Sequence, residues 1–543
     1  MIGVRLPLLF SCLLLVGLIS CETRSDVQIA NEEGILLLGN SNEPKGLDPH
    51  LVSGVLESNI IRALFEGLCV EHPSEDGTAL PGAAERWTHS DDFTEWTFYL
   101  NPDASWSDGV PVTAHDFVFA YRRLLSPDPN WPAKYSEMLY FLSGAKDYHQ
   151  GKDPDFSKVG VTADDDFTLS LKLRGPIPFL PELTKHYTWY PVPKHVILRH
   201  GEINTAFASP WTRPGNLVGN GPFMLKEWIT NHRIELVRNP HYWDAERVSL
   251  KGIRYLPVNN PYTETRMFGD GQLHVTYTIP SELIPFAQDR YPEMIRQEPY
   301  VGVYFLRANT RRPPFDNAQV RTAFSSAIYQ RAITDKILQG GQKPASGIVP
   351  PFGQYQPPAV VAFDPARAQD LLQASGYDPA GKKDITLLTT QSDSARRMAE
   401  ALQAMWKEHL GINIRIVERE WTTYLQRQYD GDFDLAIGGW IGDYLDPTTF
   451  LEMWIKDGGN NNTGWDSPEY ERLLKQAENT ADVEERMSIL SEAEGILLKE
   501  RPVFPIYWAT TNYLLRPEVK NWHPLLLNNH PFKFVELDPQ AAQ

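Results

Sequence analysis

Asp443 is the residue in this sequence whose position most needs a chemical explanation. It follows Gly438-Gly439-Trp440 in the segment 436–454, AIGGWIGDYLDPTTFLEMW, where the neighbours are mostly apolar. A second acid has an ordinary role, because Asp446-Pro447-Thr448 fits a helix N-cap followed by proline at the first helical position. Asp443 lies three residues too early for that role and needs another one. A carboxylate supplies negative charge and hydrogen-bond acceptors, so its chemistry is that of binding a cation or a donor.

Aromatic side chains are the second group that could form a site. The chain has 15 Trp, 23 Tyr and 24 Phe, and many of them fall at expected strand ends or turns. Such rings suit the walls of pockets, because they give a large contact area at a small cost in side-chain entropy. Trp421 and Trp440 are the best candidates, since both lie at predicted loop junctions near Asp443. For any single Trp, a place in the hydrophobic core is the alternative.

Motifs of catalysis are missing from the sequence. It contains no HExxH, GxSxG, phosphate-binding Gly-rich loop, CxxC pair or GxGxxG, and no two His residues stand at the spacing of metal ligands on a helix. The contiguous acids at 164–166 sit at a predicted turn, so a solvated loop is a better interpretation than a metal site. We therefore predict a protein that is not an enzyme and has no metal or cofactor.

The N-terminus predicts export. Arg5 precedes an apolar run from Leu6 to Ile19, which is too short to span a bilayer as a helix and fits a signal peptide. Ser20 and Cys21 close the run as in the bacterial lipobox, in which the cysteine becomes the lipid-modified first residue. We predict a lipoprotein with a signal peptide at 1–20 and a polar tether at 21–34; a soluble secreted protein with an incidental cysteine is the alternative. No later segment is long and apolar enough to cross a membrane.

Charge and cysteine content restrict the class of protein further. The formal net charge of −18 argues against nucleic-acid binding, because an acidic surface repels phosphates. Removal of the signal and acylation of Cys21 would leave Cys69 as the one free thiol of the mature chain. We interpret Cys69 as buried filler, because nothing nearby in the sequence would lower the pKa of its thiol.

The elements that must position Asp443 are helices alternating with short strands. A chain of 543 residues should form two or three lobes. After residue 300, helices at 320–338, 366–375, 394–410 and 424–429 alternate with apolar strands, which predicts an α/β lobe with a largely parallel sheet. Ligands of such sheets lie beyond the carboxyl ends of the strands. Because Asp443 follows the strand FDLAI closely, it should lie at such an end.

Several segments together resemble the solute-binding proteins of bacterial ABC importers, family 5, in the oligopeptide-binding subgroup. The matching segments are LDPHLVSGVLESNIIRALFEGL, WTFYLNPDASWSDGVPVTAHDFVFAYRRL, NGPFMLKEW with RNPHYWD, RPPFDNAQVRTAF and GWIGDYLDPTTFLEMW. The likeness extends from Leu36 to Phe534, and it rests on the combination rather than on any one segment.

The resemblance implies a three-lobed α/β fold like that of periplasmic binding proteins of class II or cluster C. Two hinged lobes would enclose the ligand, and an additional lobe would be inserted into the first. By this mapping lobe I is 35–65, 193–300 and 510–543, lobe II is 66–192, and lobe III is 301–509. Two crossings between lobes I and III would form the hinge.

The resemblance also implies roles for residues of the site. The aspartate of the family's Gly-Trp-x-x-Asp-Tyr segment, here Asp443, pairs with the α-ammonium of a bound peptide. The backbones of Ser53, Gly54 and Val55, and of Gly439 and Trp440, would hydrogen-bond to the peptide as a neighbouring strand does. The remaining positions are those at which family members place pocket aromatics: Trp421, Tyr277 and Tyr300.

The sequence departs from the family's pattern at two places. The cations that meet the peptide's carboxylate in well-known relatives would fall at Leu338, Ala395 and Ile437, which are all uncharged. Either Arg396, Arg397 or Arg427 replaces them, or the ligand is longer, capped or otherwise different. The family's disulfide beside the site is also missing, with Gly302 and Ile441 at its two positions.

The resemblance thus implies a lipid-anchored, monomeric receptor on the outer face of a membrane. It would capture oligopeptides by hinge closure and deliver them to an ABC permease, whose ATPase lies on other chains. A specialised ligand is the alternative: a murein peptide, a signalling peptide, or a nickel or haem complex. A peptidase on the same cleft is the remote alternative.

Overall fold

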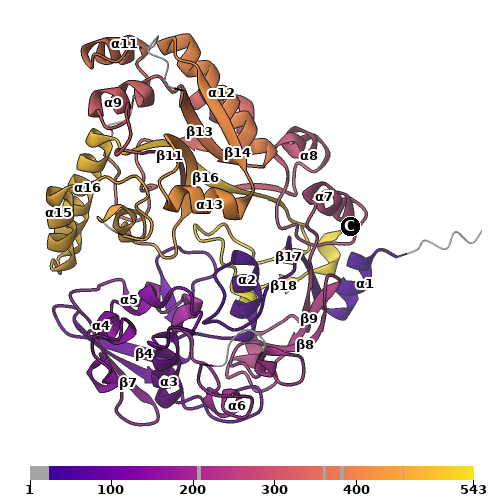
Figure 1. Ribbon diagram of the computed structural model, residues 1–543. Helices are drawn as coiled ribbons and strands as arrows, with labels where there is room; N and C mark the ends of the chain where they lie inside the picture. Colours follow the sequence, from indigo (N-terminus) through magenta and orange to yellow (C-terminus); the bar gives the residue numbers. More distant parts are fainter. Residues whose placement is uncertain (1–23, 205–208, 359–361, 379–383, 457, 543) are drawn as a thin grey trace, which may run out of the picture.

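The structure is a computed structural model that describes residues 24–204, 209–358, 362–378, 384–456 and 458–542. Figure 1 shows an upper body coloured orange, a lower purple body, and a magenta and indigo body beside it. Each body is built on one of the three larger sheets, of four, four and six strands. Residues 1–23 lie outside the described part of the chain, so the predictions for the signal peptide and Cys21 stay predictions.

The first sheet joins segments from distant parts of the sequence. Its strand order is β1 (Ile35–Gly39), β10 (Gly252–Leu256), β9 (Arg233–Arg238) and β8 (Phe223–Ile229). β1 runs parallel to β10, with Ile35 opposite Gly252. A strand close to the N-terminus thus forms the edge of a sheet whose other three strands come much later in the sequence. Around this sheet lie α1 (Asp26–Glu33), α2 (Val55–Leu64), α6 (Lys194–Ile197), α7 (Pro261–Gly269), α8 (Ile284–Arg290), β17 (Val519–Lys520) and β18 (Glu536–Leu537).

The helix α1 differs from the predicted polar tether at 21–34. Ser25 and Gln28 form a capping box at its start, and Gly34 ends it in the left-handed conformation at φ 71°. Val27 and Ala30 are buried one helical turn apart, against Leu37 of β1. The caps and this small apolar face explain why the segment folds onto the body, whereas its composition alone reads as polar.

The second sheet is antiparallel and belongs to the purple body. Its order is β4 (Ala84–His89), β5 (Glu95–Leu100), β7 (Thr168–Lys172) and β6 (Val161–Ala163). Trp96, Phe98 and Leu100 alternate along β5, and these three side chains face the core. Beside this sheet lie β2 (Cys69–Glu71), β3 (Ala79–Pro81), α3 (Ala114–Leu124), α4 (Ala145–His149) and α5 (Leu180–Leu183).

Cys69 of β2 is buried and unpaired, as predicted. Burial raises the pKa of its thiol to about 12, so it stays protonated and unreactive.

The third sheet is mixed, and the prediction of a largely parallel sheet is wrong. Its order is β12 (Lys343–Pro344), β16 (Val503–Leu514), β11 (Ile295–Ala308), β15 (Leu435–Ile441), β13 (Ile385–Thr390) and β14 (Ile414–Arg419). Only β14, β13 and β15 are parallel, and they are joined by helical crossovers through α12 (Asp393–Leu410) and α13 (Trp421–Tyr429). β11 and β16 pair antiparallel instead, because they arrive as long strands from the neighbouring body.

Helices cover both faces of the third sheet, as Figure 1 shows. Besides α12 and α13, the helical elements of this body are α9 (Ala318–Ser326), α10 (Gln330–Ala332), a π-helical turn (Ile333–Leu338), α11 (Pro365–Ala374), α14 (Thr448–Leu451), α15 (Pro468–Glu478) and α16 (Val483–Glu500). The helix predicted at 320–338 is therefore divided after Ser326. Its turns still place Val320, Phe324, Ile333 and Leu338 in one core on one face of the sheet.

β11 and β16 connect the upper body to the first one. Their pairing runs from Ile295 opposite Leu514 to Arg307 opposite Val503, with a shift in register between Pro299 and Val303. A further bridge joins Leu515 to Val275, beside β1. The two predicted crossings between lobes I and III, at 300/301 and 509/510, fall inside these strands.

Candidate ligand-binding site

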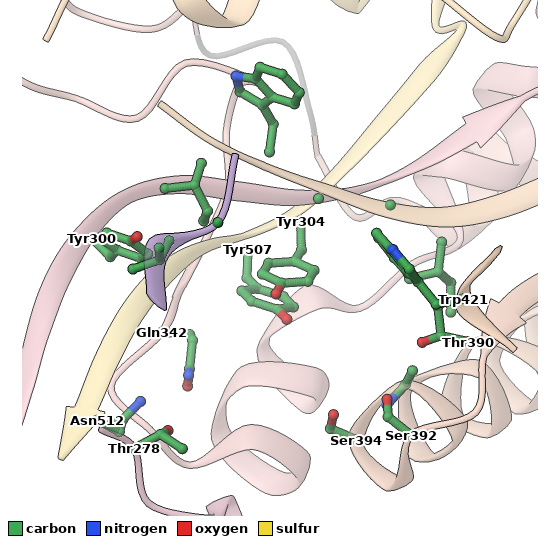
Figure 2. A pocket seen from close by; sticks show the side chains of 18 of the residues that line it. Thr278, Tyr300, Tyr304, Gln342, Thr390, Ser392, Ser394, Trp421, Tyr507 and Asn512 are labelled. Atoms are coloured by element: carbon green, nitrogen blue, oxygen red, sulfur yellow. The ribbon is translucent and has the colours of Figure 1, made fainter. Parts of the chain in front are cut away.

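A cavity of about 950 Å³ lies between the upper body and the two lower ones. Its walls come from the start of α2, the segment 278–284, β11, the start of α12, α13 and the end of β15. In Figure 2, Tyr304 and Tyr507 lie face to face in the middle, with Trp421, Ser392 and Ser394 on one side and Tyr300 on the other. The two tyrosine rings stack with centroids 4.8 Å apart and an interplanar angle of 14°.

The structure brings all the predicted site residues except Tyr277 to this one cavity. The predicted residues that line it are Ser53, Gly54, Val55, Tyr300, Trp421, Gly439, Trp440 and Asp443. Tyr277 instead lines a separate cavity of about 60 Å³, together with Tyr255, Trp522 and Phe532. Its backbone N–H donates to Glu264 at 2.9 Å, which fixes the segment on the first body.

Asp443 has no charged partner in the described part of the chain. Its backbone N–H donates to the Thr449 hydroxyl at 3.2 Å, and its carboxylate takes part in no hydrogen bond or ion pair with a described residue. The next residue, Tyr444, is buried and stacks on Phe179 of the purple body at 5.8 Å, which holds the turn in place. Burial first, and the nearby Glu137 second, raise the pKa of the Asp443 carboxyl to about 7.

Asp446 shows the opposite environment only three residues away. Its carboxylate accepts a hydrogen bond from the Thr448 N–H at 3.1 Å and so caps the first turn of α14, although the N-cap residue is Pro447 rather than the predicted Asp446. The same carboxylate forms a buried ion pair with Arg486, at 2.6 and 2.9 Å. That partner lies 40 residues later, beyond what a local pattern can reveal. The two aspartates thus differ in their partners. Described residues supply hydrogen bonds and a counterion to the Asp446 carboxylate, and they supply neither to the Asp443 carboxylate.

The aromatic and backbone positions are exposed to the cavity to different degrees. Trp421 opens α13, is 59% exposed, and stacks on Tyr424 with ring centroids 5.5 Å apart. Trp440 is half-buried, and its indole N–H has no partner among the described residues. The Tyr304 ring lies over Gly439, where a Cβ would come within 3.0 Å of it.

Ser53, Gly54 and Val55 form the start of α2 rather than a strand. Gly54 is the extended N-cap residue, at φ −99° and ψ 148°, and Val55 is the first helical residue. The extended backbone that could pair with a ligand is therefore limited to the residues before Val55.

The predicted replacements for the missing cations lie outside the cavity. Arg396 pairs with Glu418 at 2.9 Å, Arg427 with Asp432 at 2.8 Å, and Arg397 with Glu282. None of these three arginines lines the cavity, whereas the uncharged positions do, namely Leu338, Ala395 and Ile437.

The position of the missing disulfide is filled by apolar packing. Gly302 of β11 lies directly opposite Ile441 of β15. A Cβ at Gly302 would overlap the Cδ1 atom of Ile441, so the isoleucine side chain occupies the space above the glycine.

Sequence reasoning missed Arg307, Gln428 and the Tyr304–Tyr507 pair, which also line the cavity. A signal for Arg307 was available, because it is the one charged residue in the apolar run YVGVYFLRAN. No group of three or more His, Cys, Asp or Glu side chains in the described ranges is arranged to hold a metal ion. In those same ranges, no helix is both long and apolar enough to cross a membrane.

A cavity between α/β bodies that are joined by two long strands is the architecture of the extracytoplasmic solute-binding proteins. The chain belongs to the bacterial extracellular solute-binding proteins, family 5, whose middle-region model matches residues 78–462. It is 34% identical over 510 residues to the periplasmic oligopeptide-binding protein OppA of Salmonella typhimurium, covering 92% of this chain and 91% of that one.

Two solved structures are similar along nearly the whole chain. The murein tripeptide-binding protein MppA of Escherichia coli superimposes with a TM-score of 0.80 at 32% identity, covering 92% of this chain and 98% of that one. OppA of Haemophilus influenzae in complex with RPPGFSPFR gives 0.79 at 31% identity, covering 93% and 99%. The three-lobed periplasmic-binding-protein fold predicted from the resemblance is therefore confirmed.

Proposed function

We propose that this protein captures oligopeptides outside the cytoplasm and delivers them to an ABC permease, without catalysis of its own. The observation that carries the proposal is Asp443, a carboxylate in the wall of a large cavity with no cation beside it in the described part of the chain. The α-ammonium of a peptide supplies the missing charge, and the aromatic walls accept varied side chains. The membership in family 5 and the similarity to peptide-binding relatives support this function.

The binding step follows from the cost of the lone carboxylate. An ionised group enclosed without a partner is unfavourable, whereas a charge-assisted hydrogen bond to an ammonium is favourable. The ligand therefore stabilises the closed arrangement of the lobes more than the open one. This difference in stability is what drives closure of the hinge when the ligand binds. β11 and β16 are the connections around which the upper body would rotate.

The setting of the receptor belongs to the same proposal. A lipid on Cys21 would hold the protein at the outer face of a membrane, and the ATPase would reside on other chains. The periplasmic relatives support the extracytoplasmic location. We propose that the receptor acts as a monomer.

We expect peptide affinity to decrease as the pH falls from 7 to 5. With its pKa at about 7, the Asp443 carboxyl of the free protein is half protonated at neutral pH and almost fully protonated at pH 5. Because an ammonium binds the ionised form, the bound peptide must expel that proton, so affinity should fall by roughly 10- to 50-fold. Calorimetry in buffers of different ionisation enthalpy would measure both the affinity and the released proton. An affinity that stays constant from pH 7 to 5 would contradict the role of Asp443.

Replacing Trp421 by Ala should weaken peptide binding about tenfold with little effect on stability. The ring is 59% exposed and lines the cavity, so its loss removes contact with the ligand rather than core packing. Tyr429→Ala is the matched control, since Tyr429 is 78% exposed on the same helix and does not line the cavity. Titration by tryptophan fluorescence or calorimetry should show a loss for Trp421→Ala alone; equal losses in both variants would remove Trp421 from the site.

A murein peptide is the second candidate ligand, because MppA is as similar to this chain as the OppA relatives are. Native mass spectrometry of protein purified gently from cells would identify retained cargo. Ordinary peptides support the general receptor, and a muropeptide supports the specialised one. Incubation of peptides with the purified protein should give no cleavage products.

A further inference from the structure

Arg307 is a second unpaired charge in the wall of the same cavity. It lies on β11, is only 7% exposed, and lines the cavity. Its Nη1 donates to the Gln428 side-chain oxygen at 3.0 Å, while its Nε is buried without a partner. Within the described part of the chain, no carboxylate forms an ion pair with it. A guanidinium has five donors, so one neutral acceptor leaves most of its capacity unused.

The bond to Gln428 does not account for an arginine at this place. Burial lowers the pKa of Arg307, which means that its positive charge is poorly compensated. The rings of Phe305 and Trp454, 4.9 and 5.7 Å from its Cζ, offer part of the compensation through cation–π contacts. A residue that only joined β11 to α13 would not need a charge.

The guanidinium reaches the cavity past a glycine of β15. A Cβ at Gly438 would overlap the Nη1 atom of Arg307, so the space that the guanidinium fills depends on that residue having no side chain. Gly438 itself lines the cavity, and it lies five residues before Asp443. β15 ends at Ile441 and the chain bends before Asp443, so five residues of fully extended chain, about 17 Å, are an upper limit on the distance from Gly438 to Asp443.

Resting on the proposed function, we propose that Arg307 binds a carboxylate of the peptide and is the counterpart of Asp443 at the other end of the site. The preferred ligands are then short acidic peptides, with a carboxylate no more than about four or five residues from the amino terminus. That carboxylate is either the C-terminus or an acidic side chain. A planar guanidinium suits it because it can bind a carboxylate through two parallel hydrogen bonds. This anchor also explains how Leu338, Ala395 and Ile437 can be uncharged.

Calorimetry with alanine peptides of four, five and six residues tests the proposal on the unaltered protein. Each length is compared as a free acid, as a C-terminal amide, and as an amide with Glu at position four or five. At one length the free acid or the Glu peptide should bind at least about tenfold more tightly than the plain amide. The net charge of −18 repels acidic peptides, so long-range attraction cannot produce that preference.

Arg307→Gln should abolish the preference for the acid over the amide of the same length. Arg427→Gln, which removes a charge that is paired with Asp432 outside the cavity, should keep it. Preference for the free acid identifies the C-terminus as the source of the carboxylate, and preference for the Glu peptide identifies a side chain.

The two proposals fail in distinguishable ways. Amides that bind as tightly as acids at every length, with no effect of Glu, would overturn the role of Arg307 and leave peptide binding intact. No binding of any of these peptides would overturn both. If Arg307→Gln does not fold, the comparison of peptides on the unaltered protein still decides.

Discussion

Replacing Asp443 by Asn should weaken the binding of peptides by about 10²- to 10³-fold while the protein stays folded. Asn has nearly the same shape but no charge, so a bound α-ammonium would lie in an enclosed cavity without its counterion. Leaving one partner of such a pair alone costs roughly 3–5 kcal/mol, which corresponds to this loss of affinity. Calorimetry with a peptide and with its N-acetylated form checks the mechanism, because the acetylated peptide should bind both proteins equally weakly.

The same substitution should stabilise the ligand-free protein. The pKa of Asp443 is about 7 in the folded state and about 3.9 in an unfolded chain. The folded state therefore retains a proton that the unfolded state has lost, so this group lowers the free energy of unfolding as the pH rises from about 4 to about 7. The Asn variant lacks this penalty and should melt at a higher temperature than the unaltered protein at pH 8, with the difference disappearing near pH 4. Unchanged affinity, or a variant that is less stable at pH 8, would contradict the assignment.

Replacing Asp446 by Asn should instead destabilise the protein by about 3–5 kcal/mol. Asp446 and Arg486 are 2% and 3% exposed at their side chains, so the variant leaves the arginine buried without its carboxylate. Asn can still accept the hydrogen bond from Thr448, and the loss therefore reports the ion pair rather than the helix cap. Urea denaturation measures the free energy of unfolding.

A double variant tests whether the uncompensated charge of Arg486 causes the loss of stability in Asp446→Asn. Combining Asp446→Asn with Arg486→Met removes the uncompensated charge and should recover much of the lost stability. Below the melting transition, peptide affinity should change little in either variant. A loss of less than about 1 kcal/mol for Asp446→Asn alone would show that the pair contributes little.

Local patterns in the sequence were sufficient for α11, α12 and the site segment, but not for the helix predicted at 320–338, which is divided after Ser326. The spacing of apolar residues predicts α11 and α12 to within a residue or two, and the apolar neighbours of Asp443 are enough to mark that carboxylate as unusual. Tertiary neighbours account for the errors. β11 and β16 make the third sheet mixed, because they enter it from another body, and nothing in their own residues encodes that origin. The short α1 depends in the same way on packing against β1.

Prediction of the binding site from the sequence was limited in the same way, by residues that are distant in sequence and close in space. The resemblance brings Asp443, Trp440 and Trp421 to one cavity, but Tyr277 faces a different one. Arg307 was overlooked because its importance depends on Gln428 and Gly438, which are more than a hundred residues away in sequence. The partner that distinguishes Asp446 from Asp443, Arg486, lies 40 residues further along the chain. A carboxylate's role is determined by what surrounds it in space, and a single sequence does not contain that information locally.

The most direct measurement is a crystal structure of the protein with a bound peptide that has a free amino terminus. We expect the α-ammonium to lie about 2.7–2.9 Å from a carboxylate oxygen of Asp443, with the lobes closed around the peptide. A peptide whose amino terminus lies elsewhere, with the Asp443 side chain turned toward bulk water, would contradict the mechanism of binding described above.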